Sequence, residues 1–276
     1  MITRIVSDSS CDIWNIEGTD FRTAPLTIST DERSFRDDES IHIDEMITYL
    51  KGFSGPSHTA CPNAQDWMDA YLGADEIYVV CMTSTLSGTY NSALIAKDMY
   101  LEEHPEAKIQ VFDTLSTSSE QLLFIEKLAE NIKAKHSFEQ ICEEMKSYLQ
   151  QTRIFFAFRS LHNLAQNGRV NKLVASTVGV LGLSIIGTGS PEGTLTTTAK
   201  ACGDKRTIQR LREDCREAGY QGGKVRICHI KNEKLAKDLA DSFRNEYPDA
   251  DIKIYPSRGL IAYYGEEGGI IIGIEK

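Results

Sequence analysis

The sequence predicts an α/β protein of two domains, the first built on a parallel sheet and the second a mixed α+β unit. Strand-like apolar runs alternate with helical patterns through about residue 150, and such alternation requires crossover connections and a parallel sheet. Past residue 152 this rhythm changes. A chain of 276 residues is longer than a typical single domain. We therefore expect one domain over residues 1–151 and a second over residues 152–276.

The central element of the first domain is a strand, a polar turn and a helix start over residues 76–91, which read EIYVVCMTSTLSGTYN. A turn at the carboxyl end of a buried strand aims backbone N–H groups and hydroxyls outward, so it can receive an anionic or strongly polar ligand. Ser87 lies near the helix start. It can serve as a ligand donor or simply as a helix cap, since Ser and Thr cap helices routinely.

Two more strands end in polar turns. Residues 2–6 run into the turn 7–12, and residues 109–113 run into the turn 114–119. Asp8 in the first turn can bind a ligand or tie down its own backbone, and the second role is the commoner one for Asp. In a parallel sheet these turns gather on one edge, where open α/β sheets bind ligands.

The section between the strand at residues 2–6 and the strand that begins near residue 76 is less regular. Residues 25–28 indicate a strand, residues 43–50 an amphipathic helix, and residues 52–63 a loop or linker rich in Gly, Pro and hydroxyls. Pro62 suits the first turn of a helix over residues 63–72, which leaves Thr59 just outside that helix. The neighbouring His58 is interpreted as a solvated loop residue rather than a catalyst.

Helical patterns over residues 120–135 and 138–151 complete the first domain. In the second domain Arg169 belongs to a helix stop after a short helix at 161–165, and a very apolar helix is expected from Lys172 to about Leu183. Its simplest interpretation is core. A turn at 191–193 and the remaining elements follow: helices at 205–218 and 233–246, and strands at 154–158, 194–200, 224–229, 252–255 and 269–274.

Composition excludes several functional classes. A net charge of −10 argues against a nucleic-acid surface, and no apolar run is long enough to span a bilayer. We see no export signal, so we expect a cytoplasmic protein. The seven cysteines are scattered without a CxxC pair, which argues against a disulfide framework and a zinc site.

Several motifs in order resemble one family. They are IVSDSSCD near the start, Pro25-Leu26, Asp37-Asp38, Thr59 with Pro62, LSGTYNSA at 86–93, NGRVNK at 167–172, and a Gly-rich final strand. Together they cover nearly the whole chain and resemble the DegV family. The resemblance implies a two-domain α/β fold that binds one long-chain fatty acid, such as palmitate, stearate or oleate, between the domains. Some members present the acid to a fatty acid kinase, and the carrier itself is not an enzyme.

The resemblance also implies a site. Thr59 and Ser87 would hold the fatty-acid carboxylate as hydroxyls at helix starts, with Gly88 beside them. Arg169 would supply positive charge near the head group or contact the kinase, and Tyr263 stands where the family usually has a histidine. The apolar helix after Lys172 would then be a tunnel wall as well as core. No catalytic residue and no cofactor is expected.

The departures from the family pattern weaken the expectation of a kinase partner more than the expectation of a fatty-acid ligand. Tyr263 can donate a hydrogen bond but carries no positive charge near neutral pH. Glu266 and Glu267 add negative charge nearby, and Cys202 stands where an Arg is usual. Lipid binding is therefore the firmer expectation than delivery to a kinase.

Two other classes stay open on the sequence alone. A serine hydrolase would use Ser87 as nucleophile, but the surrounding residues lack the G-x-S-x-G pattern. A phosphate- or nucleotide-binding protein would use the same helix N-termini, yet neither G-x-x-x-x-G-K-[ST] nor G-x-G-x-x-G after a strand is present.

Overall fold

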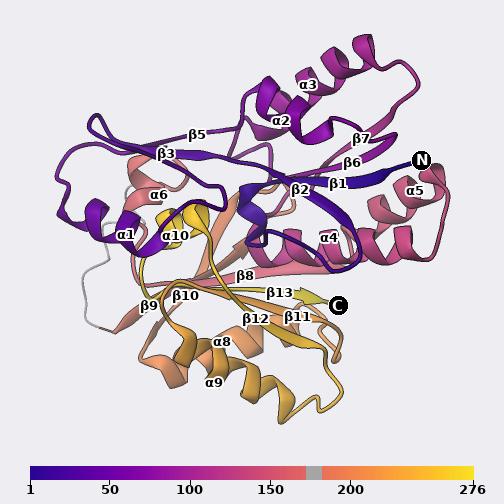
Figure 1. Cartoon of the computed structure of the whole chain (residues 1–276). Coiled ribbons are helices and arrows are strands. Elements are labelled where there is room, and N and C mark those ends of the chain that lie inside the picture. The colour runs from indigo at the N-terminus through magenta and orange to yellow at the C-terminus, as the bar shows by residue number, and fades with distance from the viewer. Residues whose placement is uncertain (172–181) are drawn as a thin grey trace.

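A computed structural model of the chain describes residues 1–171 and 182–276. The strands in this part of the chain form sheets of four, six and three strands. Figure 1 shows the N-terminal elements in the upper half of the molecule and the six-stranded sheet below, with helix α4 (Ser118–Lys133) between them.

The four-stranded sheet is parallel throughout, as the sequence predicts. Its order is β2-β1-β6-β7. In register, Val6 lies beside Val79, and Val79 beside Val111. The strands are β1 (Thr3–Asp8), β2 (Asp20–Ala24), β6 (Glu76–Cys81) and β7 (Lys108–Asp113).

Helices cover both faces of this sheet, because successive strand residues point to opposite sides. Ile77 and Val79 pack with α2 (Ala64–Tyr71) and α3 (Thr89–Glu103). Tyr78 and Val80 pack with α4 and α5 (Phe138–Tyr148). A parallel sheet buried on both faces needs continuous apolar strands, and residues 77–80 supply one.

A small antiparallel sheet, ordered β4-β3-β5, also belongs to the N-terminal half of the chain. Its strands are β3 (Thr27–Ser29), β4 (Ser34–Arg36) and β5 (His58–Ala60). Helix α1 (Ile43–Gly52) separates β4 from β5 and packs against α10 (Gly259–Gly265). The last helix of the chain therefore returns to the N-terminal elements (Figure 1).

The six-stranded sheet is mixed, in agreement with the predicted α+β unit. Its order is β10-β9-β8-β13-β11-β12, with β11 and β12 parallel and the other described pairs antiparallel. The strands are β8 (Thr152–Phe158), β9 (Leu183–Gly189), β10 (Leu195–Cys202), β11 (Val225–His229), β12 (Ile252–Pro256) and β13 (Ile270–Glu275).

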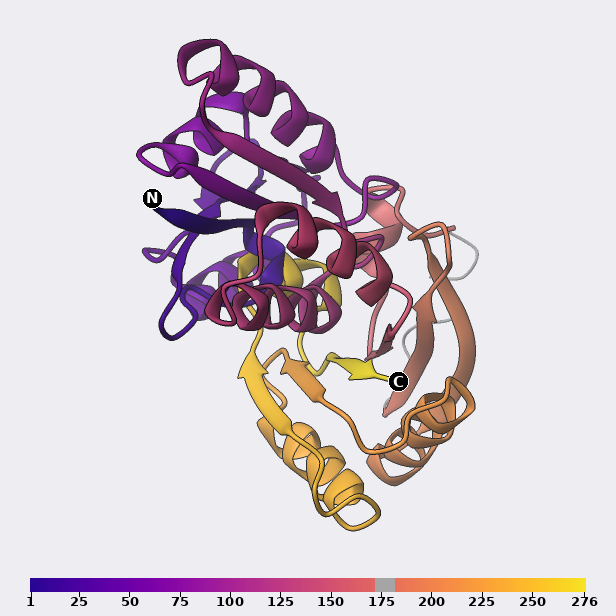
Figure 2. The same cartoon turned by 90° about the vertical axis from the view of Figure 1, so that its right-hand side faces the viewer.

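The two faces of this sheet pack against different parts of the chain. On one face Phe155 and Ile186 pack with α8 (Asp204–Glu217) and α9 (Glu233–Arg244). On the other, Phe156 and Ile185 form an apolar cluster with Ile261 of α10 and with α6 (His162–Gln166). Helix α4 also packs on β13 and β11, so it contacts both large sheets (Figure 2).

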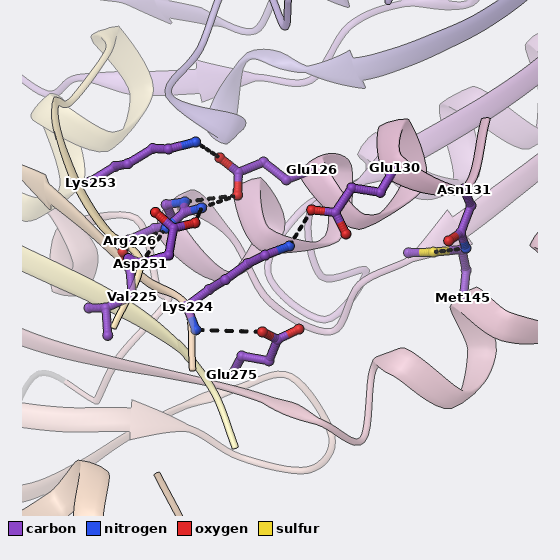
Figure 3. A network of polar contacts seen from close by, with 10 residues as sticks. All are labelled: Glu126, Glu130, Asn131, Met145, Lys224, Val225, Arg226, Asp251, Lys253 and Glu275. Atoms are coloured by element: carbon purple, nitrogen blue, oxygen red, sulfur yellow. Dashed lines mark hydrogen bonds and ion pairs between the residues drawn. The ribbon is translucent and has the colours of Figure 1, made fainter. Parts of the chain in front are cut away.

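A charged network joins α4 to β11 and β12 (Figure 3). The Arg226 side chain is 1% exposed, and its Nη2 lies 2.6 Å from both Glu126 and Asp251. Lys253 approaches Glu126 at 3.4 Å, and Lys224 pairs with Glu130. A buried guanidinium needs such partners, because an unpaired charge inside a protein is very costly.

Several elements were not expected from the sequence, among them strand β9. Strands β2 and β4 lie in the section interpreted as irregular, and β5 lies within the predicted loop at 52–63. Helix α10 was also missed. Its N-terminus is capped from a distant loop, since Asp37 accepts hydrogen bonds from the backbone N–H groups of Gly259 and Leu260 at 2.9 and 3.0 Å. No local cap therefore marks this helix in the sequence.

The apolar helix expected from Lys172 to about Leu183 lies, through residue 181, outside the described residues; Leu183 begins β9. The boundary between residues 151 and 152 stays a prediction. Within the described ranges, no helix is long and apolar enough to cross a membrane.

Candidate functional site

The polar turns after β1, β6 and β7 meet at one edge of the parallel sheet, as predicted. The carboxylate of Asp8 accepts a hydrogen bond from the backbone N–H of Met82 at 2.7 Å, and the N–H of Thr83 donates to Ser116 at 2.8 Å. Asp8 also accepts from the N–H of Ser10 and is fully buried. Of its two candidate roles, Asp8 therefore has the structural one of holding the turns together.

The tip of the β9–β10 hairpin docks on the turn after β6. Thr83 and Thr85 both donate hydroxyl hydrogen bonds to the carbonyl of Gly193, at 3.0 and 2.8 Å. Gly193 has φ of +82°, which an L side chain rarely adopts. A Cβ atom there would also collide with the Thr83 hydroxyl. These two threonines therefore join the two halves of the chain.

Ser87 lies at the N-terminus of α3, where Gly88 is the N-cap residue. The Ser87 hydroxyl is 2.7 Å from that of Thr89 and accepts a hydrogen bond from the Thr89 N–H at 3.3 Å. Two hydroxyls carry two protons, and only one can lie between the two oxygens. Because Thr89 is buried and Ser87 is half-buried, Ser87 is the member of this pair that can donate outward.

Thr59 lies on strand β5. The prediction that it lies at a helix start is therefore wrong. The Thr59 hydroxyl is 2.7 Å from the hydroxyl of Tyr264 on α10. The helix that follows is capped by Asn63 instead, which forms a reciprocal capping box with Asp66. As with Ser87 and Thr89, the pair of Thr59 and Tyr264 holds two protons but needs only one between the oxygens.

The chain after Thr59 lies against the first turn of α3. Ser92 donates a hydroxyl hydrogen bond to the carbonyl of Pro62 at 2.6 Å. A Cβ atom on Gly88 would lie 3.4 Å from the sulfur of Cys61. The segment that carries Thr59 and the helix start that carries Ser87 are therefore neighbours, although the sequence separates them by a strand and a helix.

Arg169 follows α6 in a complete Schellman motif, which is the helix stop that the sequence predicts. The N–H of Arg169 donates to Leu164 at 2.8 Å, and that of Gly168 donates to Ala165 at 3.2 Å. Gly168 has φ of +74°, the left-handed conformation that this motif needs after the helix. The backbone at Arg169 is thus fixed by hydrogen bonds.

The guanidinium of Arg169 extends toward the turn after β6. Its Nε donates to the carbonyl of Leu86 at 3.2 Å, and its Nη1 donates to the carbonyl of Asn167. A guanidinium has five N–H donors, more than these two bonds use. Leu86 and Tyr264 also pack around one apolar cluster, so Arg169, Tyr264 and the residues next to Ser87 lie close together.

Tyr263 is buried and has hydrogen-bond partners on two other segments. Asn167 Nδ2 donates to the Tyr263 hydroxyl at 2.8 Å, and that hydroxyl lies 2.7 Å from the hydroxyl of Ser57. It also lines a cavity of about 560 Å³ between α1, α6 and α10. Tyr263 and Tyr264, although adjacent, therefore face different surroundings.

Both phenols stay neutral at physiological pH. Burial raises the pKa of Tyr264 and of Tyr263. The hydrogen bonds that Tyr264 shares with Thr59 and that Tyr263 shares with Ser57 and Asn167, and the charge of Arg169, act in the opposite direction but are smaller effects. A neutral phenol is a hydrogen-bond donor, so Tyr264 can donate to a carboxylate.

Apolar surface begins next to these polar groups. Tyr264 and Val170 pack on the cluster formed by the inner face of the six-stranded sheet and by α6 and α10. Its buried members are Ile154, Phe156, Phe158, Leu161, Leu164, Ile185, Cys228, Ile261 and Ile271. A ligand with a polar head and an apolar body matches this combination.

Glu266 and Glu267, the acidic residues that depart from the family pattern, both contact other residues of the chain. Glu266 accepts hydrogen bonds from the Ser160 hydroxyl at 2.7 Å and from the N–H of Asn163 at 3.2 Å. Glu267 pairs with Lys51 of α1. Cys202 is exposed at the end of β10. Among the described residues, no group of His, Cys, Asp and Glu is arranged to hold a metal ion.

The structure thus brings Thr59, Ser87, Gly88 and Arg169 to one place, while ligand contact by each stays a prediction. Sequence reasoning missed Tyr264 there. Because α10 was not recognised, nothing indicated which of two adjacent tyrosines would face Thr59.

Comparison with known proteins identifies relatives over the full length. The model of a family described as "Uncharacterised protein, DegV family" matches residues 3–276. A DegV domain-containing protein of Streptococcus pneumoniae serotype 4 is 39% identical over 279 residues, covering 100% of this chain and 99% of the relative. One from Streptococcus pyogenes serotype M1 is 37% identical, covering 100% of both.

Solved structures agree closely with the fold. A DegV family protein from Eubacterium eligens, loaded with heptadecanoic acid, has a TM-score of 0.98 at 46% identity, covering 99% of each chain. The Streptococcus pneumoniae Fatty Acid Kinase (Fak) B3 protein, loaded with linoleic acid, has a TM-score of 0.97 at 39% identity, covering 100% of this chain and 99% of its own. A DegV family protein from Ruminococcus gnavus, refined with vaccenic acid, has a TM-score of 0.89 at 27% identity, covering 99% of each chain.

Proposed function

Because the chain belongs to the DegV family, we propose that it binds one long-chain fatty acid, such as palmitate, stearate or oleate, between its N-terminal and C-terminal parts. The fatty acids in the Eubacterium eligens and Streptococcus pneumoniae structures support this proposal. The carboxylate is held by the hydroxyls of Thr59, Ser87 and Tyr264, by the guanidinium of Arg169, and by the helix N-terminus at Gly88.

One observation supports this assignment above others. Hydroxyl pairs with a spare proton, Thr59 with Tyr264 and Ser87 with Thr89, lie beside a cation and next to a large apolar cluster. Hydroxyls and a guanidinium donate hydrogen bonds, which a carboxylate accepts. An acyl chain gains about 0.8 kcal/mol for each methylene that it buries, so the apolar cluster can provide most of the affinity.

The chain acts as a carrier without chemistry of its own. The Ser87 hydroxyl bonds Thr89, a hydroxyl rather than a base, and a serine nucleophile needs an adjacent base. A hydrolase is therefore less well supported than a binding protein. The carrier is cytoplasmic, and a fatty acid kinase is the partner that similarity to the Fak B3 protein suggests. The acidic residues that weaken this expectation, Glu266 and Glu267, are both engaged in contacts within the chain.

The test is to express the chain in a bacterial host and analyse it by native mass spectrometry before and after mild organic extraction. A retained mass equal to one long-chain fatty acid, lost on extraction, supports the proposal. Protein that carries only phosphates or nucleotides, and that does not take up added oleate, would overturn it. Incubation with an acyl ester tests the hydrolase alternative, which requires turnover that Ser87→Ala abolishes.

A further inference from the structure

Tyr263 connects the two segments that carry proposed head-group residues. Its hydroxyl accepts a hydrogen bond from Asn167 Nδ2 at 2.8 Å. Since Asn167 supplies that proton, the phenol's own proton is directed to Ser57, whose hydroxyl is 2.7 Å away and whose carbonyl is 3.3 Å away. Ser57 lies two residues before Thr59, and Asn167 lies two residues before Arg169.

Both partners of Tyr263 lie close in the chain to residues of the proposed site. Asn167 is the C-cap residue of α6, and its carbonyl accepts the Nη1 hydrogen bond of Arg169. The two N–H groups of its side-chain amide donate to Tyr263 and to the carbonyl of Asn163 at 2.9 Å. On the other side, Ser57 is buried immediately before β5.

The hydroxyl of Tyr263 is engaged within the chain. Its side chain is about 2% exposed, and its hydroxyl makes one accepted and one donated hydrogen bond within the chain. Its ring packs against that of Tyr264 with centroids 4.9 Å apart. Tyr264, in contrast, bonds Thr59 directly.

We infer that Tyr263 is a positioning residue for the carboxylate site: its hydroxyl links Ser57 to Asn167 and so sets the separation between Thr59 and Arg169, while Tyr264 contacts the ligand. This inference rests on the proposed function. A carboxylate bound by both Thr59 and Arg169 needs them at a fixed spacing, and an uncharged head group depends far less on Arg169. Tyr263 therefore controls selectivity for a charged head group rather than affinity for the acyl chain.

The test uses Tyr263→Phe, which removes one oxygen and keeps the ring. Binding of palmitate and of hexadecanol, which has the same chain length and an uncharged head, is measured for each protein. Loss of the linking hydroxyl is expected to weaken palmitate binding about tenfold, the effect of misplacing one hydrogen bond between the carboxylate and Thr59 or Arg169, and to leave hexadecanol binding within about twofold. Tyr220→Phe is the matched control, because Tyr220 is a buried tyrosine that donates to Gly223 on the opposite face of the six-stranded sheet.

A double-mutant cycle separates positioning from a general structural role. In an Arg169→Gln background, Tyr263→Phe is expected to have no further effect on palmitate binding, because the residue that it positions has lost its charge. If Tyr263→Phe is poorly folded, Asn167→Ala breaks the same link from the other side and should give the same selective loss. Equal losses for palmitate and hexadecanol, or equal effects of Tyr263→Phe with and without Arg169, would overturn the inference. A wild-type chain that binds no palmitate overturns the proposed function itself, and this inference with it.

Discussion

The hydroxyls of Thr59 and Tyr264 lie 2.7 Å apart, although 205 positions separate the two residues in the chain. Thr59 belongs to a short strand near the N-terminal sheet, and Tyr264 to a helix that follows the last but one strand of the other half. The contact depends on α10 lying among N-terminal elements, where Asp37 and Asp12 bind the backbone at its start. The proposed head-group site is therefore assembled from both halves of the chain.

The first prediction concerns the hydroxyls of Thr59 and Ser87, which we propose to hold the carboxylate. Thr59→Val and Ser87→Ala should each weaken fatty-acid binding by about 1.5–3 kcal/mol, because each removes a hydrogen bond to a charged group. Titration calorimetry with a soluble fatty acid measures the loss. Ser84→Ala is the control, since Ser84 is an exposed residue of the same turn. Unchanged affinity in variants with the wild-type circular dichroism spectrum would place the head group elsewhere.

A second prediction is that fatty-acid affinity changes little between about pH 5.5 and 7.5, provided that the ligand carboxylate stays ionised. Burial raises the pKa of Tyr264, so the phenol is neutral throughout this range and its charge does not change. Tyr264→His places an imidazole with an ordinary pKa of about 6.5 in this position. The variant should bind more tightly on the acid side, where the imidazole is positive. Marked pH dependence in the natural protein, unaltered in the variant, would show that Tyr264 does not face the carboxylate.

The sequence predicted the regular parts of this fold and the residues at their ends. The run 77–80 and the turn after it identified a parallel sheet with polar turns at one edge, since strand periodicity and helix starts are local properties. The helix stop before Arg169 was equally readable, because the Schellman motif depends on one glycine. Local patterns therefore specified where Ser87 and Arg169 lie in the fold.

Long-range contacts were not predictable in this way. Helix α10 has its N-terminal groups satisfied by Asp37, more than 200 positions away, and β5 is a strand only because it pairs with β3. The hydrogen bond between Thr59 and Tyr264 depends on both of these long-range contacts. The resemblance directed attention to Tyr263, and the tertiary contact that distinguishes it from Tyr264 is absent from any local pattern.

The third prediction tests the contact between the β9–β10 hairpin and the turn after β6. Gly193→Ala should destabilise the protein by more than about 1 kcal/mol, because it adds a collision with Thr83 to the strain of a positive φ. Gly73→Ala is the matched control, with φ of +86° and no atom of the described chain within 4 Å of the added Cβ. Urea denaturation of both variants measures the difference. Equal destabilisation would mean that the hairpin tip can move away from Thr83 without cost.

The fourth prediction concerns the buried cation between α4 and β11. Arg226→Ala should cost about 3–5 kcal/mol of unfolding free energy, because it leaves Glu126 without its buried partner. Arg244→Ala, which removes an exposed pair with Asp241, should cost no more than about 1 kcal/mol. Similar losses in the two variants would show that the network in Figure 3 is well solvated.

The last prediction concerns Asp12, whose carboxylate accepts hydrogen bonds from the backbone N–H of Arg258 at 2.6 Å and from the Ser118 hydroxyl at 2.5 Å. Burial raises the pKa of Asp12 from 3.8 to about 7. Between these two values the folded protein holds a proton that the unfolded chain has lost, so this group makes the unfolding free energy fall as pH rises from about 4 to 7. Burial raises the pKa of Asp8 and Asp37 in the same direction, and the lowered pKa of His229 acts in the opposite one.

The contribution of Asp12 is isolated by Asp12→Asn, which stays neutral and keeps an oxygen that can accept from Arg258. Urea denaturation at pH 5, 6, 7 and 8 should show a decline in the unfolding free energy toward alkaline pH that is smaller in Asp12→Asn than in the natural protein. Asp98→Asn, at an exposed position of α3, should leave the decline unchanged. If Asp12→Asn and the natural protein follow parallel curves, Asp12 does not titrate in this range, and the start of α10 is held by a carboxylate that stays ionised.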